Sequence, residues 1–335
     1  MYYKIIFTLS LITGTLIAIS SYSWMGMWIG LEINLISIIP MMSDTKNMMA
    51  SEAALKYFIA QTLASSLLLF STIILSMNFF YNPEMNLYMS LILNTSLLTK
   101  MGAAPFHFWF PEIMSGLSWP MSLIMLTWQK IAPMTLITYF KLSPYYIIIA
   151  IIFSMMISGI MGLNQTSLRK ILAYSSINHI GWMLSTIMVK ENIWFLYFII
   201  YTIITMNIIL FFWMSNIFHL KQLFNLMNYN FSIKFSFTLN FLSLAGFPPL
   251  LGFLPKWLTI QSLTENKMFT MATLMIIMTL MTFYFYLRTI FSGLLLNTNE
   301  LAFFSSPPLK SSWIFMFNFT AIIGLIFSTM LFNFL

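Results

Sequence analysis

Runs of apolar residues follow one another along almost the whole chain, and only short polar connections separate them. An α-helix needs about 20 such residues to cross the hydrocarbon core of a membrane. Only 7% of the 335 residues are charged, whereas a soluble domain carries about 25%. No polar stretch is long enough for a separate soluble domain. The sequence therefore predicts an all-α polytopic membrane protein, with residues 1–335 in a single membrane domain.

Eleven segments have the length and apolar character of a membrane span. They are Tyr3–Ser21, Trp24–Met42, Ala53–Met77, Tyr88–Phe110, Trp119–Phe140, Tyr145–Leu163, Leu168–Val189, Ile193–Phe218, Phe235–Leu263, Met268–Leu294 and Ser312–Leu335. An odd number of spans places the two termini on opposite faces of the membrane.

The residue usage indicates an organelle genome. Thirty methionines and 34 phenylalanines stand against a single valine, Val189, and two arginines. An AT-rich gene, read with a code in which ATA means methionine, produces this bias. Mitochondrial encoding and a mitochondrial inner-membrane location follow as expectations.

Basic residues in the connections predict the orientation, because they gather on the inner side of a membrane. Eight fall on the face of the N-terminus and three on the other, which places the N-terminus in the matrix and the C-terminus in the intermembrane space. The eight are Lys4, Lys46, Arg169, Lys170, Lys221, Lys234, Arg288 and Lys310, and the three are Lys141, Lys190 and Lys267.

Two of the predicted spans are interrupted by glycine and proline. Leu97–Pro111 contains Gly102 and Pro105, and Leu242–Trp257 contains Gly246 with three prolines. Two broken helices at corresponding positions are typical of inverted-repeat transporters. We therefore expect two inverted five-helix repeats, the first at about 1–218 with the Lys100 break and the second at about 235–335 with the Lys256 break.

Four of the charged side chains inside predicted spans are the main candidates for chemistry, because a charge within a membrane is costly and marks a pathway for ions or protons. They are Glu32, Lys100, Lys130 and Lys256. A carboxylate that approaches or leaves a buried lysine changes how tightly that lysine holds its proton. The set predicts a proton relay. Two alternatives stay open at this point, a structural ion pair for Glu32 and a snorkelling side chain for Lys100.

Three further residues are secondary candidates. Lys56 follows Glu52 by four residues, a spacing that favours a structural ion pair. His107 could pass protons between Lys100 and the surface, because an imidazole group ordinarily titrates near neutral pH, or it could be a hydrogen-bonded core residue. His179 lies in a stripe of hydroxyl and amide side chains that either holds water or joins helices. Glu112 is expected to be a solvated loop acid.

The sequence predicts no cofactor, nucleotide or nucleic-acid site. The chain has no cysteine, which excludes thiolate-bound iron–sulfur clusters and zinc. Its three histidines lie far apart, and no phosphate-binding or dinucleotide-binding glycine motif is present. The lysines that give a net charge of +7 are scattered, so we expect no binding of nucleic acid.

Several motifs resemble the subunit 2 family of mitochondrial NADH dehydrogenase, in an insect-like form. They cover nearly the whole chain in order: Trp28–Asn34, Glu52–Phe58, Lys100–Trp109, Thr127–Pro133, Leu168–Trp182 and Gly246–Trp257. The resemblance implies an antiporter-like fold in the membrane arm of respiratory complex I. It also implies that Glu32, Lys100, Lys130 and Lys256 carry the functional charges.

By that resemblance, the chain translocates protons while electrons pass from NADH to ubiquinone on other subunits. FMN, the iron–sulfur clusters, NADH and ubiquinone would bind elsewhere, so this chain would hold no cofactor and no metal. Its expected partners are neighbouring antiporter-like and small accessory subunits, and phospholipids such as cardiolipin. Two alternatives stay open: a stand-alone cation/proton antiporter, and a structural scaffold subunit.

Overall fold

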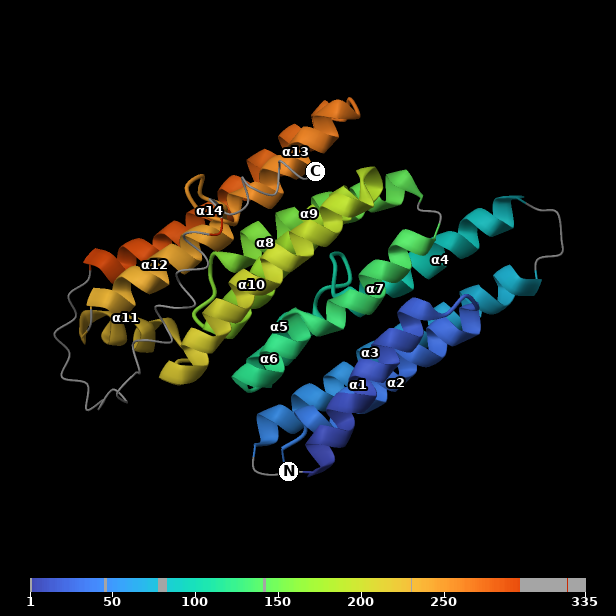
Figure 1. Ribbon diagram of the computed structural model, residues 1–335, viewed down its shortest axis with the longest axis horizontal. Helices are drawn as coiled ribbons and strands as arrows, with labels where there is room; N and C mark the ends of the chain where they lie inside the picture. The colour runs from blue at the N-terminus through green and yellow to red at the C-terminus, as the bar shows by residue number, and fades with distance from the viewer. Residues whose placement is uncertain are drawn as a thin grey trace. The chain divides into compact units, whose positions relative to one another are not determined.

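The computed structural model describes residues 2–44, 47–77, 83–140, 143–229, 231–295 and Gly324. This part of the chain forms fourteen α-helices (Figure 1). They are α1 Tyr2–Ser20, α2 Trp24–Met42, α3 Met48–Met77, α4 Pro83–Met101, α5 Trp109–Gly116, α6 Trp119–Leu126, α7 Trp128–Tyr139, α8 Pro144–Gly162, α9 Leu168–Val189, α10 Glu191–Ser215, α11 Leu220–Tyr229, α12 Phe231–Ala245, α13 Phe253–Glu265 and α14 Phe269–Leu295.

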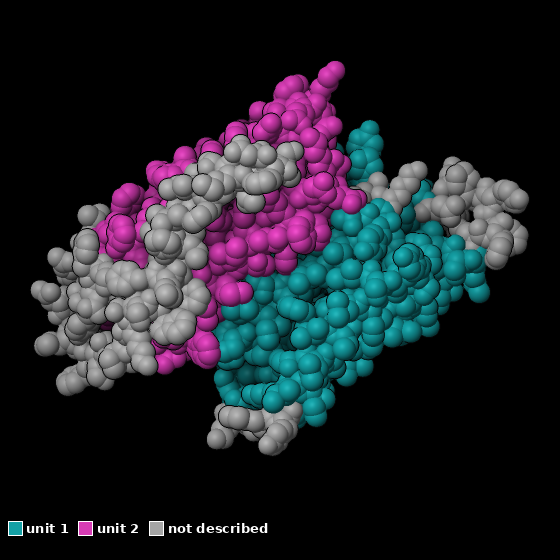
Figure 2. Space-filling model, viewed as in Figure 1, with its two compact units in different colours: residues 1–154 teal, residues 155–335 magenta. Residues whose placement is uncertain are grey.

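The chain divides into two compact units, Met1–Ser154 and Met155–Leu335 (Figure 2). In unit 1, α3 packs against α2, α4 and α5, while α7 packs against α1, α4 and α6. Small residues bring α1 and α2 together, because a Cβ atom on Gly30 would lie within 2.8 Å of the Ala18 Cβ. Close backbone approach at glycine and alanine is how helices associate where the hydrophobic effect cannot drive them.

In unit 2, α9 is the most enclosed helix. It contacts α10, α13 and α14, and its residues from Ile171 to Ile187 are all buried. Four buried hydroxyls on α9 donate to their own helix, three residues back, so none of them is left unsatisfied. The donors are Ser175, Ser176, Ser185 and Thr186. This local pairing lets a polar sequence occupy the interior of the unit.

The helical prediction is confirmed, and the bounds of Trp24–Met42 and Leu168–Val189 match α2 and α9. Six of the described helices are long and apolar enough to cross a membrane: α1, α2, α3, α8, α10 and α14. The predicted spans Tyr88–Phe110 and Phe235–Leu263 are indeed broken, into α4–α5 and α12–α13. The predicted span Ser312–Leu335 lies outside the described residues, apart from Gly324.

Two features differ from the prediction. The expected single span Trp119–Phe140 is interrupted at Thr127, between α6 and α7. The Thr127 hydroxyl donates to the Leu123 carbonyl at 2.8 Å, a back-bond that bends helices, and Pro133 removes a backbone donor further along. The amphipathic helix α11 was not predicted, because ten residues with four polar side chains do not resemble a span.

Both breaks are built from the same turn. At the end of α4, Ala103 N donates to Leu98 O and Gly102 N donates to Thr99 O. At the end of α12, Phe247 N donates to Leu242 O and Gly246 N donates to Ser243 O. This pair of bonds is the Schellman motif, which requires a left-handed residue. Gly102 and Gly246 supply it, with φ of 72° and 82°.

The glycine at the second break also makes room for a lysine. A Cβ atom on Gly246 would lie 2.9 Å from Cδ and 3.1 Å from Nζ of Lys256. Gly246→Ala is therefore expected to destabilise the subunit by about 1–2 kcal/mol from the left-handed backbone alone. The measurement is the thermal inactivation midpoint of the assembled complex. Ser243→Ala, one turn earlier with an ordinary helical backbone, is the control, and an unchanged midpoint for Gly246→Ala would contradict the expectation.

Candidate functional site

Glu32 and Lys100 lie in unit 1 and act on one another electrostatically. Glu32 is half-buried in the middle of α2, and its Oε1 atom is buried without a hydrogen bond to any described residue. Lys100 is buried in the last turn of α4, where the helix dipole favours a cation. No ion pair joins the two side chains in the described structure, so their charges attract without direct contact.

Side chains satisfy the carbonyl groups that the first break exposes. Gln61 Nε2 donates to the Lys100 carbonyl at 3.4 Å, and Trp109 Nε1 donates to the Thr99 carbonyl at 3.1 Å. His107 is buried in the turn itself, with Nδ1 3.2 Å from the Pro105 carbonyl. The turn that holds Lys100 is thus anchored from α3 and from α5.

Among the described lysines of unit 1, Lys130 is the most deeply buried, with 1% of its surface exposed. It lies in the first turn of α7, directly after the interruption at Thr127, and its Nζ atom is 5.7 Å from the ring centre of Phe110. An ammonium group over an aromatic face gains a cation–π attraction. The structure thereby confirms that Lys130 is buried.

Tyr57 and Gln129 join this group although the sequence did not single them out. The buried Tyr57 hydroxyl donates to Gln129 Oε1 at 3.2 Å, and Tyr57 also interacts electrostatically with Glu32. Gln129 precedes Lys130 in the chain. Polar side chains of α3 and α7 thus meet at the Tyr57–Gln129 bond, and Glu32 on α2 acts on Tyr57 electrostatically. The sequence feature that could have identified Tyr57 is its spacing from Gln61, because the two polar residues lie one turn apart inside an apolar run.

In unit 2, Lys256 is buried in the first turn of α13. Its Nζ atom donates to the Ala245 carbonyl at 2.8 Å and lies 6.0 Å from the ring centre of Trp182. The Ala245 carbonyl is one of those that the end of α12 leaves without a helical partner. The second break therefore supplies the acceptor for its own lysine.

The other histidine candidate also lies in unit 2. His179 is buried on α9, and its Nδ1 atom is hydrogen-bonded to the Tyr197 hydroxyl at 2.8 Å. The ring of Tyr201 lies against it at 5.0 Å between centres. His179 is thus a hydrogen-bonded core histidine. Together with Tyr197 it also provides a group that can donate a proton and a group that can accept one.

Lys56 lies apart from the buried charges. Its Nζ atom is 3.0 Å from Glu52 and 2.9 Å from Glu112, and its side chain is 44% exposed. The expected pair with Glu52 is confirmed. Glu112 is a solvated acid as expected, with 57% of its side chain exposed, but its expected place in a loop is wrong, because it lies in the first turn of α5 and pairs with α3 across 56 residues of sequence.

One charged pair joins connections outside the spans. Lys190 donates to Glu265 at 2.7 Å, and this bond holds the pKa of the Glu265 carboxyl below its ordinary value. A lowered carboxyl pKa means that the pair is charged at neutral pH, and that its contribution to stability disappears as the pH falls through that pKa. Both side chains are about half exposed, so that contribution is small.

Comparisons with known proteins define the class. The family model for the membrane region described as NADH:quinone oxidoreductase/Mrp antiporter matches residues 21–282. A chain of respiratory complex I from Thermus thermophilus aligns over 97% of this chain and 78% of its own length, with a TM-score of 0.86 and 22% identity. A chain of the Mrp complex from Dietzia aligns over 86% and 59%, with a TM-score of 0.73 and 15% identity. The fold is that of the antiporter-like membrane subunits.

The particular family follows from sequence relatives. NADH-ubiquinone oxidoreductase chain 2 of Anopheles gambiae is 49% identical over 335 residues, which cover 98% of this chain and 97% of the relative. The chain 2 of Locusta migratoria is 46% identical over 303 residues, covering 90% and 89%. This chain belongs to the NADH-ubiquinone oxidoreductase chain 2 family, and it is therefore a membrane subunit of respiratory complex I. The resemblance drawn from the motifs is confirmed.

Because the ion pairs of Lys56 are exposed, we expect this residue to have a structural role and no role in proton transfer. Lys56→Gln removes the charge on a half-exposed side chain that lies in the third turn of α3. We expect the number of protons pumped per ubiquinone reduced to stay at the wild-type value, as measured in proteoliposomes. Lys190→Gln, another exposed and ion-paired lysine, is the matched control. A pumping defect confined to Lys56→Gln would place Lys56 on the proton route.

Proposed function

We propose that this chain carries protons across the inner mitochondrial membrane through Glu32, Lys100, Lys130 and Lys256. Electron transfer from NADH to ubiquinone on other subunits would drive the transfer. The observation that supports this proposal most is the Glu32–Lys100 arrangement in unit 1. The buried Lys100 ammonium interacts electrostatically with the Glu32 carboxylate without an ion pair, and Glu32 Oε1 is buried with no hydrogen-bond partner among the described residues.

The physical basis is the sensitivity of a buried ammonium to the distance of its counter-charge. Coulomb energy varies inversely with separation, and it is several-fold larger inside a protein than in water. When the Glu32 carboxylate approaches, Lys100 holds its proton more tightly, and when the carboxylate moves away, Lys100 releases it. A conformational change in neighbouring subunits that moves α2 against α4 would then load and unload this site.

Tyr57 and Gln129 extend the route from Glu32 toward Lys130. The Gln129 Nε2 atom is buried without a described partner, while its Oε1 atom accepts from Tyr57. A buried donor without a partner is costly unless water fills the gap. We propose that ordered water binds there and connects the Tyr57–Gln129 pair to the Lys130 ammonium.

In unit 2, Lys256 would be the fourth charged group of the relay. His179, hydrogen-bonded to Tyr197, is a candidate for onward transfer, and His107 is a candidate for exchange between Lys100 and the surface. Sodium is a poor alternative cargo because it requires several oxygen ligands, and Glu32 is the only carboxylate among the four charges.

The proposed topology has eleven spans. The broken pairs α4–α5, α6–α7 and α12–α13 would each cross once, as would α9, with the N-terminus in the matrix and the C-terminus in the intermembrane space. The two Schellman breaks would mark corresponding positions in inverted repeats. Neighbouring antiporter-like subunits, small accessory subunits and phospholipids such as cardiolipin are the proposed partners.

Lys100→Met tests the relay directly. Methionine matches the length of the lysine stem without its charge, so we expect assembly to persist while the number of protons pumped per ubiquinone reduced falls. The measurement is that ratio in proteoliposomes, with Lys221→Met, an exposed lysine in α11, as the control. A wild-type ratio in the assembled Lys100→Met complex would rule out the relay and favour a scaffold role.

Tyr57→Phe tests the link to Lys130. The loss of one hydrogen bond should cost about 1 kcal/mol of stability. We expect the rate of ubiquinone reduction to fall several-fold. We expect the number of protons pumped per ubiquinone reduced to fall as well. Tyr139→Phe is the matched control in the same unit, because the Tyr139 hydroxyl donates to the Ile19 carbonyl at 3.2 Å, away from the four charges. If Tyr57→Phe and Tyr139→Phe pump the same number of protons per ubiquinone reduced, Tyr57 has a packing role only.

A further inference from the structure

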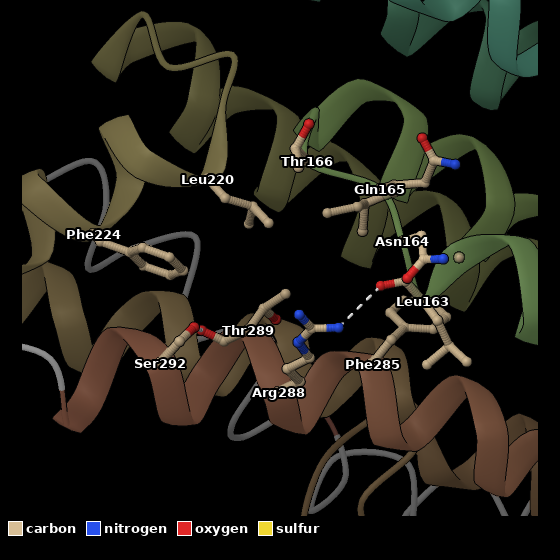
Figure 3. A pocket seen from close by; sticks show the side chains of 12 residues that line it. Leu163, Asn164, Gln165, Thr166, Leu220, Phe224, Phe285, Arg288, Thr289 and Ser292 are labelled. Carbon is tan, nitrogen blue, oxygen red and sulfur yellow. Dashed lines mark hydrogen bonds between the residues drawn. The ribbon is translucent and has the colours of Figure 1, made fainter.

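A cavity of about 290 Å³ lies at one end of unit 2 (Figure 3). The loop after α8, the first turn of α9, the start of α11 and the last turns of α14 surround it. Leu220, Phe224 and Phe285 form an apolar side, and Asn164, Thr166 and Ser292 contribute polar groups. The proposed proton route uses none of these residues.

Backbone hydrogen bonds hold one wall of the cavity in place. Leu168 N donates to Phe218 O at 3.0 Å and Leu220 N donates to Thr166 O at 3.1 Å, which makes an antiparallel bridge between Ser167 and His219. Gln222 Oε1 accepts from the Phe218 amide at 2.9 Å and fixes the start of α11. The cavity is therefore preformed and does not depend on mobile side chains alone.

The cavity is equipped for an anion. Figure 3 shows the Arg288 guanidinium reaching from α14 toward the loop after α8, where Nη1 donates to the Leu163 carbonyl at 3.3 Å. A guanidinium group has five N–H donors, so most of them are available to a ligand. No carboxylate is among the described residues that line the cavity.

The surrounding charges have the same sign. The described cations at this end of unit 2 are Arg169, Lys170, Lys221, Lys234 and Arg288. The described acids of unit 2, Glu191 and Glu265, lie at the other end, beside Lys190. A general preference of loops for positive charge explains the cations, but it does not explain a preformed cavity with a guanidinium donor inside it.

The position of the cavity favours a lipid over a small ion. The neighbouring helix α11 packs Leu223 and Met227 against unit 2 and exposes Lys221, and the candidate spans α8 and α14 both end at the cavity, which places it at the level of lipid headgroups. A free phosphate would make no favourable contact with the apolar side of the cavity. That side fits the glycerol and the first methylene groups below a headgroup.

We propose that this cavity binds the phosphodiester headgroup of an anionic phospholipid, with Arg288 on the phosphate and Leu220, Phe224 and Phe285 against the glycerol and acyl chain. This inference rests on the phospholipid partner proposed above, to which it assigns a site, and it does not depend on the proposed proton route. The bound lipid would fasten α14 to α9 and α11 at the level of the headgroups.

The test uses the assembled complex, delipidated in detergent and supplied with phosphatidylglycerol that carries a photoactivatable headgroup. Cross-links are mapped to the peptides containing residues 163–171 and 285–292. We expect Arg288→Gln to reduce labelling of these peptides about tenfold. Lys234→Gln is the matched control, because Lys234 lies at the same end and also donates to one backbone carbonyl, that of Leu294, but does not line the cavity.

Ser292→Phe gives a second variant that fills the cavity without changing its charge, so the proposal stays testable if Arg288→Gln fails to assemble. Labelling should fall in Ser292→Phe, persist in Lys234→Gln, and resist competition by inorganic phosphate and by phosphatidylcholine. Unchanged labelling in Ser292→Phe or in assembled Arg288→Gln overturns the proposal. An equal loss in Lys234→Gln shows only general attraction by charge and also overturns it. Displacement by inorganic phosphate identifies a small-ion site instead.

Discussion

An ammonium group inside a membrane must find an acceptor, a counter-charge or water, and two of the buried lysines, Lys256 and Lys100, meet this requirement in different ways. Lys256 donates to the carbonyl that ends α12. Lys100 lies in the last turn of α4 and feels Glu32 from a distance. Although one lysine precedes its break in sequence and the other follows it, both are held at the carbonyl end of a half-helix. The break and the lysine therefore stabilise one another.

The two breaks share more than proline and glycine. Each has a left-handed glycine, the same pair of Schellman bonds, and the same seven-residue separation between half-helices, 102–108 and 246–252. A further backbone bond lies at the same position after each glycine. Phe106 N donates to Ala103 O in one turn, and Leu250 N donates to Phe247 O in the other. The repeated turn supports the inverted-repeat proposal, and it explains why glycine is required at two positions in particular.

Helix type, the two breaks and the burial of Lys100, Lys130 and Lys256 could be predicted because apolar length, glycine and proline act locally. The interruption at Thr127 could not, since a threonine back-bond competes with an otherwise good helix. Contacts such as Tyr57–Gln129 and Lys56–Glu112 join residues 72 and 56 positions apart, and only packing brings them together. The cavity beside Arg288 arises in the same way, from four separate elements.

A proton route through unit 1 requires water where the protein offers polar atoms without partners. The most direct measurement is a map of the assembled complex at a resolution that shows ordered water around α2, α4 and α7. The relay predicts water between the Glu32 carboxylate and the Lys100 ammonium, and further water bound to Gln129 Nε2 beside Lys130. A dry interior, with Glu32 and Lys100 in direct contact in every state of the turnover cycle, would contradict it.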